Sequence, residues 1–213
     1  MTPTKDYLAR CSALIEIVSA QEAEICRAAD LFAKTILAGR MVHVFGSGHS
    51  RILAEEMWPR YGSFPGFHPI VELSLTFHNQ VVGANGQRQA MFLENVGGLA
   101  EQILRNFDIT PVDSALVVSS SGCNRVPIEM AEGFRKLGVP VVAIISRSHS
   151  EANATKDPRG KKLQDFADIV LDTGAPPGDA MVHVEGLDTP VAPGSTVGGA
   201  LLVNAMKAER RFG

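Results

Sequence analysis

The chain contains few cysteines, few aromatic residues and no long apolar run. Its three cysteines, Cys11, Cys26 and Cys123, are odd in number and are not spaced as CxxC, which argues against a disulfide framework and against a cysteine zinc cluster. Arg10 and Glu16 interrupt the apolar residues near the N-terminus, and no later stretch is long enough to span a bilayer. We therefore expect reduced thiols, no signal peptide and no membrane segment, as in a cytoplasmic protein.

The chain also lacks a block of like charge. Its 20 lysines and arginines and its 23 aspartates and glutamates are scattered, and the formal net charge is −3. A nucleic acid or an anionic membrane is recognised by a basic patch, so we expect neither as a partner. The apolar fraction of 45% is enough for a sizeable core, and we expect one domain spanning residues 1–213.

Apolar residues near the N-terminus recur at steps of three and four, which indicates one face of a long helix. They are Leu8, Cys11, Ile15, Val18, Ile25, Ala29, Phe32 and Ile36. Gly39 is a suitable end for this helical segment, residues 1–39. Because a helix this long overhangs a domain of this size, we expect it both to cover the sheet and to pair with a second subunit. The expected assembly is a homo-oligomer, a dimer or a tetramer.

Strand-like runs then alternate with helical patterns. The strand-like runs are "MVHVF", "PIVEL", "ALVVS", "PVVAII" and "DIVLD", and the helical patterns cover 50–58, 87–106, 125–137 and 161–166. This alternation predicts an α/β fold, a three-layer sandwich around a mainly parallel five-stranded sheet. "ALVVS" and "PVVAII" are apolar on both faces, as strands covered on both sides require.

The segment after Asp172 is rich in glycine and proline over more than twenty residues. Such a length is unusual for a plain connection in a compact domain and is often functional. We expect a short strand at "AMVHV" within it. The run "STVGGALLVNAMKAERR" then predicts an amphipathic C-terminal helix whose last turns carry basic residues, Arg210 and Arg211 among them.

Three loops follow predicted strands or open predicted helices, where ligands collect in an open parallel sheet. They are "VFGSGHSR", "VVSSSGCNRVP" and "VAPGSTVGG". Each loop supplies glycine for close backbone approach and hydroxyl groups that can donate to anionic oxygens. One such loop by itself would be an ordinary polar turn, but three on one sheet edge indicate a binding site for an anion.

A dinucleotide is one alternative. Gly46-x-Gly48 after a strand begins the dinucleotide fingerprint, and Glu72 lies near the expected ribose-binding position. However, Arg51 stands where the fingerprint requires a small third residue. The sequence around Gly160-Lys161 does not match a phosphate-binding P-loop either. Thr155 stands in place of the first glycine of that motif, and Lys162 stands in place of its final serine or threonine. Nucleotides are therefore disfavoured.

The serine-rich second loop favours a terminal phosphate. It places Ser119, Ser120, Ser121 and the amide of Gly122 at the mouth of the next helix, with Asn124 available as its cap. Pro127 fits the first turn of that helix, where its missing N–H matters little.

The motifs "FGSGHS", "SSSG" and "GST" resemble those of the SIS (sugar isomerase) domain over about residues 20–210. More narrowly, "VPIEMA", "GKKL", "ADIVLD" and "PGDA" resemble a bacterial family of stand-alone SIS proteins. The resemblance implies a flavodoxin-like sandwich, a phosphosugar ligand and a dimer or tetramer with sites near subunit boundaries. It also implies that the first, second and third loops bind the substrate. The residues concerned are Ser47, Gly48, Ser50, Ser119, Ser120, Ser121, Gly122, Asn124, Ser195 and Thr196.

The same resemblance places Glu56 of "AEEM" on the catalytic base of phosphoheptose isomerase. Aldose–ketose isomerisation needs one base that removes a proton next to a carbonyl and returns it to the neighbouring carbon. Phosphoheptose isomerase also draws a histidine from its C-terminal helix, and "STVGGALLVNAMKAERR" has none. We expect His49 of the first loop to act as the acid instead. The plain alternative is that Glu55 and Glu56 are both solvated helix residues.

Other polar groups are weaker candidates. His68 and His78 lie in the connection after the first crossover helix, and Cys123 lies at a helix N-terminus where a thiolate is stabilised. His183-x-Glu185 is a pair without further ligands at a recognisable spacing, so we expect no metal. Lys161 and Lys162 are typical of a solvated face.

We therefore predict a sugar-phosphate isomerase that uses Glu56 and His49 and needs no cofactor. One alternative is a non-catalytic phosphosugar sensor, because SIS domains also serve as the ligand-binding halves of transcription regulators. Another is a lyase or etherase that uses the same glutamate for elimination.

Overall fold

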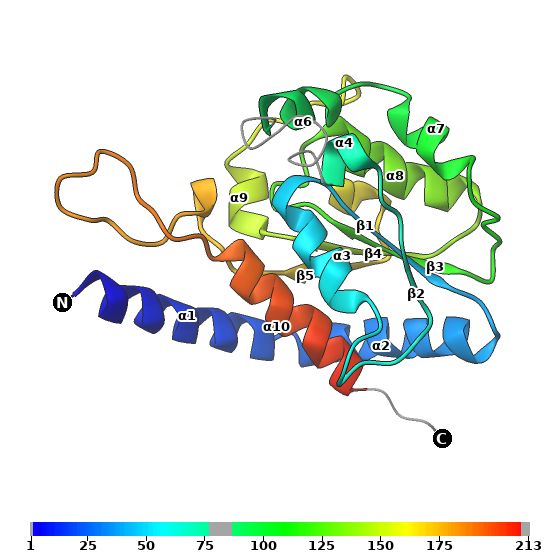
Figure 1. The fold of residues 1–213 in the computed structure, drawn as a ribbon, viewed down its shortest axis with the longest axis horizontal. Helices are drawn as coiled ribbons and strands as arrows, with labels where there is room; N and C mark the ends of the chain where they lie inside the picture. The colour runs from blue at the N-terminus through cyan, green and yellow to red at the C-terminus, as the bar shows by residue number, and fades with distance from the viewer. Residues whose placement is uncertain (1, 77–86, 210–213) are drawn as a thin grey trace.

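The computed structural model describes residues 2–76 and 87–209 and shows a parallel sheet covered by helices on both faces (Figure 1). Its strands are β1 (Val42–Gly46), β2 (Phe67–Pro69), β3 (Ser114–Val118), β4 (Val141–Ile145) and β5 (Ile169–Asp172). They lie in the order β2-β1-β3-β4-β5, and every neighbouring pair is parallel. The predicted α/β fold with a five-stranded parallel sheet is confirmed.

Helices connect the strands and flank them at both ends of the chain. The α-helices are α1 (Pro3–Ser19), α2 (Glu22–Leu37), α3 (Arg51–Met57), α4 (Leu73–Thr76), α6 (Gln87–Leu93), α7 (Leu99–Leu104), α8 (Arg125–Lys136), α9 (Arg147–Glu151) and α10 (Ser195–Ala208). Short 3-10 turns are η1 (Gly48–Ser50), η2 (Leu163–Phe166) and η3 (Pro177–Asp179). In the described ranges, no helix combines the length and the apolarity needed to cross a membrane.

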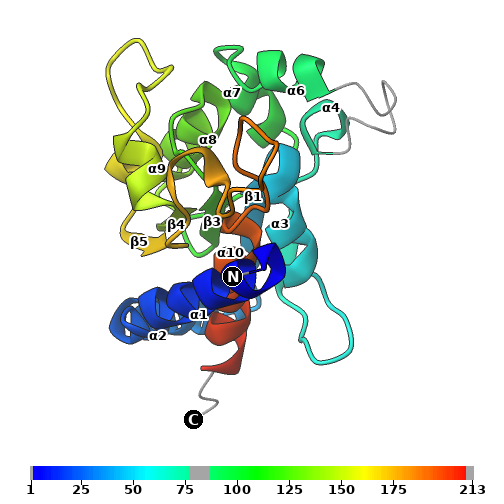
Figure 2. The ribbon, with the colours of Figure 1, turned by 90° about the vertical axis from the view of Figure 1, so that its left-hand side faces the viewer.

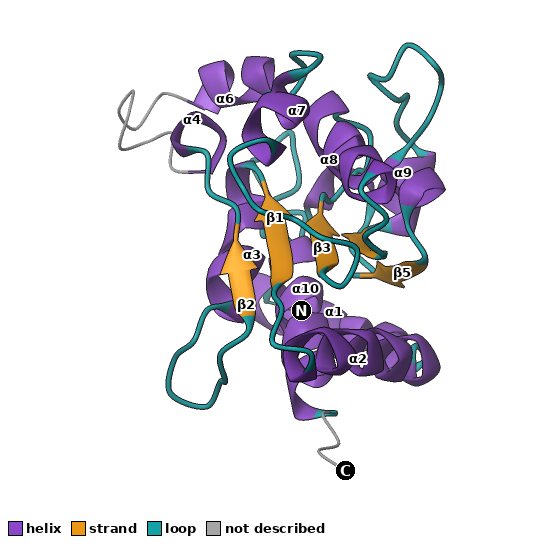
Figure 3. Ribbon diagram, turned by 90° about the vertical axis from the view of Figure 1, so that its right-hand side faces the viewer, coloured by secondary structure: helices purple, strands orange, loops and turns teal. Residues whose placement is uncertain are grey.

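Alternate residues of each strand feed two separate apolar layers. Val44, Leu116 and Ile144 pack with α2, α3 and α10, whereas Phe45, Val117 and Ile145 pack with α7 and α8. Figures 2 and 3 show α2 and α10 on one side of the strands and α7 and α8 on the other. Because side chains alternate across a strand, the central strands are apolar throughout, as predicted.

The N-terminal segment forms two helices where the apolar pattern predicts one. The break falls at Ala20 and Gln21, between α1 and α2. The Gln21 side chain donates to the carbonyl of Asp172 at 2.8 Å and accepts from the Asp172 amide at 2.7 Å. This pair of bonds holds the junction against the end of β5, while α1 extends beyond the sheet (Figure 1).

Three other boundaries differ from the predicted ones. β2 occupies residues 67–69 rather than 69–73, and the segment predicted as a helix over 87–106 divides into α6 and α7. The division spans residues 94–98, between the end of α6 at Leu93 and the start of α7 at Leu99, and Gly98, with a left-handed φ of 83°, precedes α7. The strand expected at 180–184 is reduced to a single bridge between Val182 and Val191. Arg210 and Arg211, predicted in the last helical turns, lie outside the described residues.

A buried ionic cluster closes the amino end of the sheet. Arg40 donates to both carboxylate oxygens of Asp113, which also accepts from the backbone amides of Met41 and Thr110. His43 on β1 lies opposite His68 on β2, and their Nδ1 atoms are 2.9 Å apart. The Nε2 atom of His43 is 3.6 Å from Asp113. His68, a weaker candidate for the site, therefore belongs to this structural cluster.

We predict that the free energy of unfolding falls as the pH is lowered from about 7 to about 5. Burial lowers the pKa of both His43 and His68 from an ordinary value of about 6.5. The unfolded chain therefore takes up protons that the folded chain does not, and stability is lost at up to about 1.4 kcal/mol per pH unit for each proton. Urea denaturation at a series of pH values measures this slope.

The variant carrying both His43→Phe and His68→Phe should show a flatter slope over the same range. His183→Gln is the matched control, because His183 is exposed and its loss should leave the slope unchanged. The pKa of Asp113 is depressed: burial opposes this shift, but the hydrogen bond from Arg40 and those from backbone amides outweigh it. The stability that ionised Asp113 gives the folded chain is lost only below about pH 4, which is outside the range of pH 5 to 7. A double variant with the wild-type slope would contradict the assignment.

Candidate functional site

A cavity of about 250 Å³ opens at the carboxyl edge of the sheet, and we call it the sheet-edge cavity. The loops after β1 and β3 and the first turn of α10 all line it. The predicted site residues that it brings together are Ser47, Gly48, His49, Ser50, Ser119, Ser120, Ser121, Asn124, Ser195 and Thr196. Gly122 and Glu56 are not among its lining residues.

The first loop turns sharply into α3 because of its glycines. Ser50 donates its amide to the carbonyl of Ser47 at 3.0 Å, which closes the turn η1. A Cβ on Gly46 would lie 2.5 Å from the carbonyl oxygen of Ser50, so no side chain fits there. Gly48 has a φ of +54°, a conformation that glycine adopts without strain. The loop thereby presents Ser47 and His49 to the cavity.

The second loop places serine hydroxyls against the cavity wall. The backbone carbonyl of Ser120 accepts from the amide of Ser146 at 2.8 Å, which fixes the loop to the end of β4. The Oγ atom of Ser120 is buried and has no hydrogen-bond partner among the described residues. A buried hydroxyl without a partner is unusual in a folded protein, and here it lies in a cavity wall.

Gly122 plays a structural part in this loop. Its amide donates to the carbonyl of Ser119 at 3.1 Å, and a Cβ on it would lie 3.1 Å from Gln164 and 3.3 Å from Ile145. Gly122 remains a predicted substrate-binding residue, but it is not among the residues that line the cavity. The amide is already satisfied within the turn, and the residue packs against β4 and η2.

Glu94 is a site residue that the sequence analysis missed. It follows α6, lines the cavity and is only 9% exposed. Its Oε2 atom accepts from Nδ2 of Asn124 at 2.6 Å, so Asn124 bonds this carboxylate instead of capping α8. Burial raises the pKa of Glu94, and hydrogen bonds from Ser47 and Asn124 oppose that rise. The carboxylate is thus held between the first two loops.

The third loop is already occupied by a carboxylate from within the chain. Asp179 accepts from the amides of Gly194 and Ser195 at 3.0 and 2.7 Å and from the Ser195 hydroxyl at 2.6 Å. Asp179 lines the cavity, and although it belongs to the motif "PGDA", the sequence analysis gave it no role in the site. Ser195 is therefore engaged with Asp179, while Thr196 beside it also lines the cavity.

Glu56, the predicted base, lies on the side of α3 that faces α10. Its carboxylate accepts from Asn204 at 3.2 Å and from Arg60 at 2.8 Å. Lys207 donates to its backbone carbonyl at 2.9 Å. Burial acts to raise the pKa of Glu56, but the hydrogen bond from Asn204 and the charges of Lys207 and Arg60 bring it below the ordinary value. Within this chain, Glu56 joins two helices and does not reach the cavity.

The remaining candidates divide between the cavity and the interior. His49 is exposed at the cavity, and His149, which was not predicted, also lines it and accepts from the amide of Gly178 at 2.9 Å. Cys123 is buried, with its Sγ atom near backbone carbonyls, and does not line the cavity. His78 lies outside the described residues. In the described part of the chain, no three residues form a metal-binding group.

The dinucleotide alternative gains no support from Glu72. Its carboxylate accepts from the amide of Leu75 at 2.8 Å and so caps the short helix α4. Glu72 is not among the residues that line the sheet-edge cavity. The residue near the ribose-binding position of the dinucleotide fingerprint therefore caps the N-terminus of α4 in this structure.

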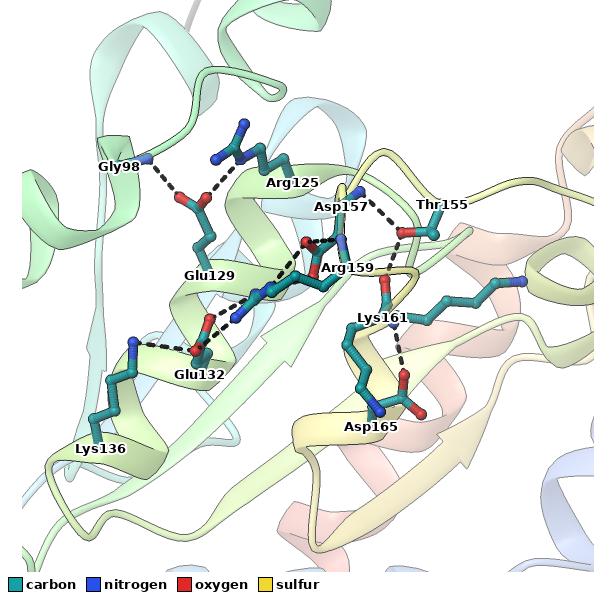
Figure 4. A network of polar contacts seen from close by, with 11 residues as sticks. Gly98, Arg125, Glu129, Glu132, Lys136, Thr155, Asp157, Arg159, Lys161 and Asp165 are labelled. Atoms are coloured by element: carbon teal, nitrogen blue, oxygen red, sulfur yellow. Dashed lines mark hydrogen bonds and ion pairs between the residues drawn. The ribbon is translucent and has the colours of Figure 1, made fainter.

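A second cavity of about 710 Å³ lies on the outer face of α7 and α8. Its polar rim forms a network of internal ion pairs, in which Arg125 bonds Glu129, and Arg159 bonds both Glu132 and Asp157 (Figure 4). These bonds tie the loop before η2 to α8. The charges of Arg125 and Arg159 are thus neutralised by carboxylates within the chain. In the sheet-edge cavity, by contrast, the buried Ser120 hydroxyl has no partner among the described residues, and the carboxylate of Glu94 is also buried. The smaller cavity is therefore the candidate site.

Relatives share the sequence over most of the chain. A family model described as the SIS domain matches residues 6–146. A UPF0309 protein from Halalkalibacterium halodurans is 36% identical over 167 residues, which cover 78% of this chain and 66% of that protein. A UPF0309 protein from Listeria monocytogenes serotype 4b is 36% identical over 197 residues, which cover 92% of this chain and 77% of the relative.

Solved structures share the fold at low identity. A phosphoheptose isomerase from Francisella tularensis matches with a TM-score of 0.61 and 19% identity over 98% of both chains. The Vibrio vulnificus NanR protein complexed with ManNAc-6P matches with a TM-score of 0.55 and 17% identity, over 97% of this chain and 59% of that one. These findings confirm the resemblance seen in the three loops: the chain belongs to the SIS domain family and, within it, to the UPF0309 proteins.

Proposed function

We propose that the chain binds a phosphorylated sugar in the sheet-edge cavity and interconverts its aldose and ketose forms. One observation carries this proposal: the cavity has serine hydroxyls, including the unpartnered one of Ser120, on one wall and the buried carboxylate of Glu94 on another. Hydroxyl and amide donors suit a phosphate. A carboxylate beside them suits proton transfer at the carbons of the bound sugar.

The geometry favours Glu94 as the base. Its carboxylate would take the proton from the carbon beside the carbonyl and return it to the neighbouring carbon, through an enediol. His49, at the same cavity, would move a proton between the two oxygens. The product is an isomer of the substrate, so no redox cofactor takes part. The assignment of Glu56 remains a prediction from family resemblance, and paired variants distinguish the two carboxylates.

Glu94→Gln should lower kcat by about 10²–10⁴-fold, which is the usual contribution of a positioned acid or base, while Glu56→Gln should change it only a few-fold. The substrate is first found by thermal-shift screening of sugar phosphates, because a ligand of the folded state raises Tm. Turnover is then followed by direct detection of the aldose and ketose. A large loss in Glu56→Gln with normal turnover in Glu94→Gln would transfer the role to Glu56.

Asn124→Ala should move the acid limb of the pH–rate profile to higher pH. Burial raises the pKa of Glu94, and the Asn124 hydrogen bond holds it down, so losing that bond raises it further. The base must be ionised to act, and activity is therefore lost at a higher pH as the solution is acidified. Thr196→Ala, at the same cavity, is the control and should leave the limb in place. An unshifted limb in Asn124→Ala would argue against Glu94 as the base.

A second candidate function is a phosphosugar sensor. The observation that favours it is the shared fold with the NanR protein, whose solved structure holds ManNAc-6P. A sensor binds its sugar phosphate without turnover. Binding detected by thermal shift, with no isomerisation of any bound sugar and no elimination product, would favour this function over the isomerase and over a lyase or etherase.

We further propose that the N-terminal segment, residues 1–39, joins copies of the chain into a dimer or tetramer. Leu8 and Ile15 are two helical turns apart on α1 and are 59% and 48% exposed. Of the residues of α1, Leu14 and Val18 are buried against the rest of the chain. An exposed apolar stripe on a projecting helix is typical of a subunit interface.

The double variant Leu8→Glu and Ile15→Glu should have a lower mass in solution than the wild type, because charge on both faces of such an interface opposes association. Light scattering coupled to size-exclusion chromatography measures this mass. Leu137→Glu, at the end of α8 and 42% exposed, places one glutamate on another exposed apolar position and should not change the mass. A wild-type chain that is monomeric at tens of micromolar would contradict the proposal.

A further inference from the structure

The sheet-edge cavity is lined by two carboxyl groups and by the imidazoles of His49 and His149, but by no ammonium or guanidinium group among the described residues. Glu94 and Asp179 both line it, and none of its described lining residues is lysine or arginine. The segment 77–86, which the structure does not describe, contains no lysine or arginine in its sequence either. The donors that the described lining offers to a phosphate are therefore hydroxyls, amides and imidazoles, and the rest of a ligand would meet two carboxyl groups.

Asp179 decides which part of the ligand lies at the start of α10. A helix N-terminus usually attracts an anion, but here the Asp179 carboxylate already takes the amides of Gly194 and Ser195. A phosphate cannot use the same two donors, so it is directed to the loop of Ser119, Ser120 and Ser121. The sugar portion of the ligand is then left to face Asp179.

The backbone at Asp179 fixes the position of this carboxylate at the start of α10. Asp179 has a φ of 55° and is one of two residues other than glycine with positive φ in the described part of the chain. The turn just before it, at Gly178, also has a positive φ, of 78°. Aspartate tolerates this conformation better than most residues, and the three hydrogen bonds from Gly194 and Ser195 hold the carboxylate in place.

An ionised carboxylate accepts hydrogen bonds and never donates them. Asp179 uses three acceptor positions on its cap, one of them on Oδ2, and an oxygen of this kind offers a further lone pair. A ligand group beside it must donate, and an ammonium group donates with a favourable charge. A carboxylate on the ligand would meet like charge from both Glu94 and Asp179.

We propose that the ligand is an amino sugar phosphate with a free ammonium group that Asp179 recognises. This inference rests on the proposed binding of a phosphosugar in the same cavity. It excludes sugar acids, including those with an acidic side chain on the ring, and it ranks an N-acetylated sugar below the free amine because acetylation removes the charge.

Isothermal titration calorimetry of the full chain at pH 6.5 tests the inference with four probes. They are glucosamine 6-phosphate, glucose 6-phosphate, N-acetylglucosamine 6-phosphate and 6-phosphogluconate. We expect the Kd of glucosamine 6-phosphate to be at least tenfold lower than that of glucose 6-phosphate, and 6-phosphogluconate to bind most weakly. Equal Kd values for the amine and the hydroxyl sugar would overturn the inference and leave the phosphosugar site intact. Failure of every sugar phosphate to bind would overturn the proposed function itself.

Asp179→Asn locates the preference. Asparagine is also a good helix cap, so its side-chain oxygen can keep accepting from Gly194 and Ser195 while the charge is removed. The variant should lose the tenfold preference and bind glucose 6-phosphate within about threefold of the wild type. Asp188→Asn, an exposed position in the same segment, is the matched control and should keep the preference. A preference that survives in Asp179→Asn would assign recognition of the amine to another group.

Discussion

The pairing of β1 with β3 is the constraint on which the site depends. Gly46 lies opposite Val118 in the register of these two strands, so the loops that begin at Ser47 and Ser119 leave the sheet side by side. The helices that follow them diverge, because α3 packs on one face of the sheet and α8 on the other. A crevice necessarily opens where strand order reverses in this way. Every other part of the site is added around that crevice.

The two edges of the sheet have opposite chemistry. At the amino edge, Arg40 and two backbone amides pair with the buried carboxylate of Asp113, and His43 packs beside it with its Nε2 atom 3.6 Å away. At the carboxyl edge, the polar groups are arranged around an open volume, and the hydroxyl of Ser120 is left without a partner in the described residues. Both edges contain a buried polar atom without a hydrogen-bond partner in the described residues, Nε2 of His43 at one and Oγ of Ser120 at the other. Only the polar groups of the carboxyl edge lie around an open volume that a ligand can enter, and this volume distinguishes the binding site from the structural cluster.

Sequence reasoning reached the first two loops because they follow strands directly. A strand-like run that ends in glycine and serine predicts a polar group at the carboxyl edge, and Ser47 and Ser119 lie there. Glu94 could not be found in this way. It reaches the cavity because α6 ends at Leu93, directly before it, and because its carbonyl accepts from the amide of Val126 at 2.8 Å. Asp179 likewise depends on a contact with α10 across fifteen residues. Glu56 was predicted from family resemblance, which does not say which way a side chain on α3 points.

The clamp between Gln21 and Asp172 joins the N-terminal helices to the floor of the cavity. Gln21 holds both the amide and the carbonyl of Asp172, and the next residue, Thr173, lines the cavity. Two hydrogen bonds therefore connect the α1–α2 junction to the residue before Thr173 at the cavity. From this junction, α1 projects past the sheet (Figure 1). If subunits assemble through α1, contacts with the neighbouring copy fix the position of α1. Through Gln21 and Asp172, the same contacts then affect the position of Thr173 at the cavity.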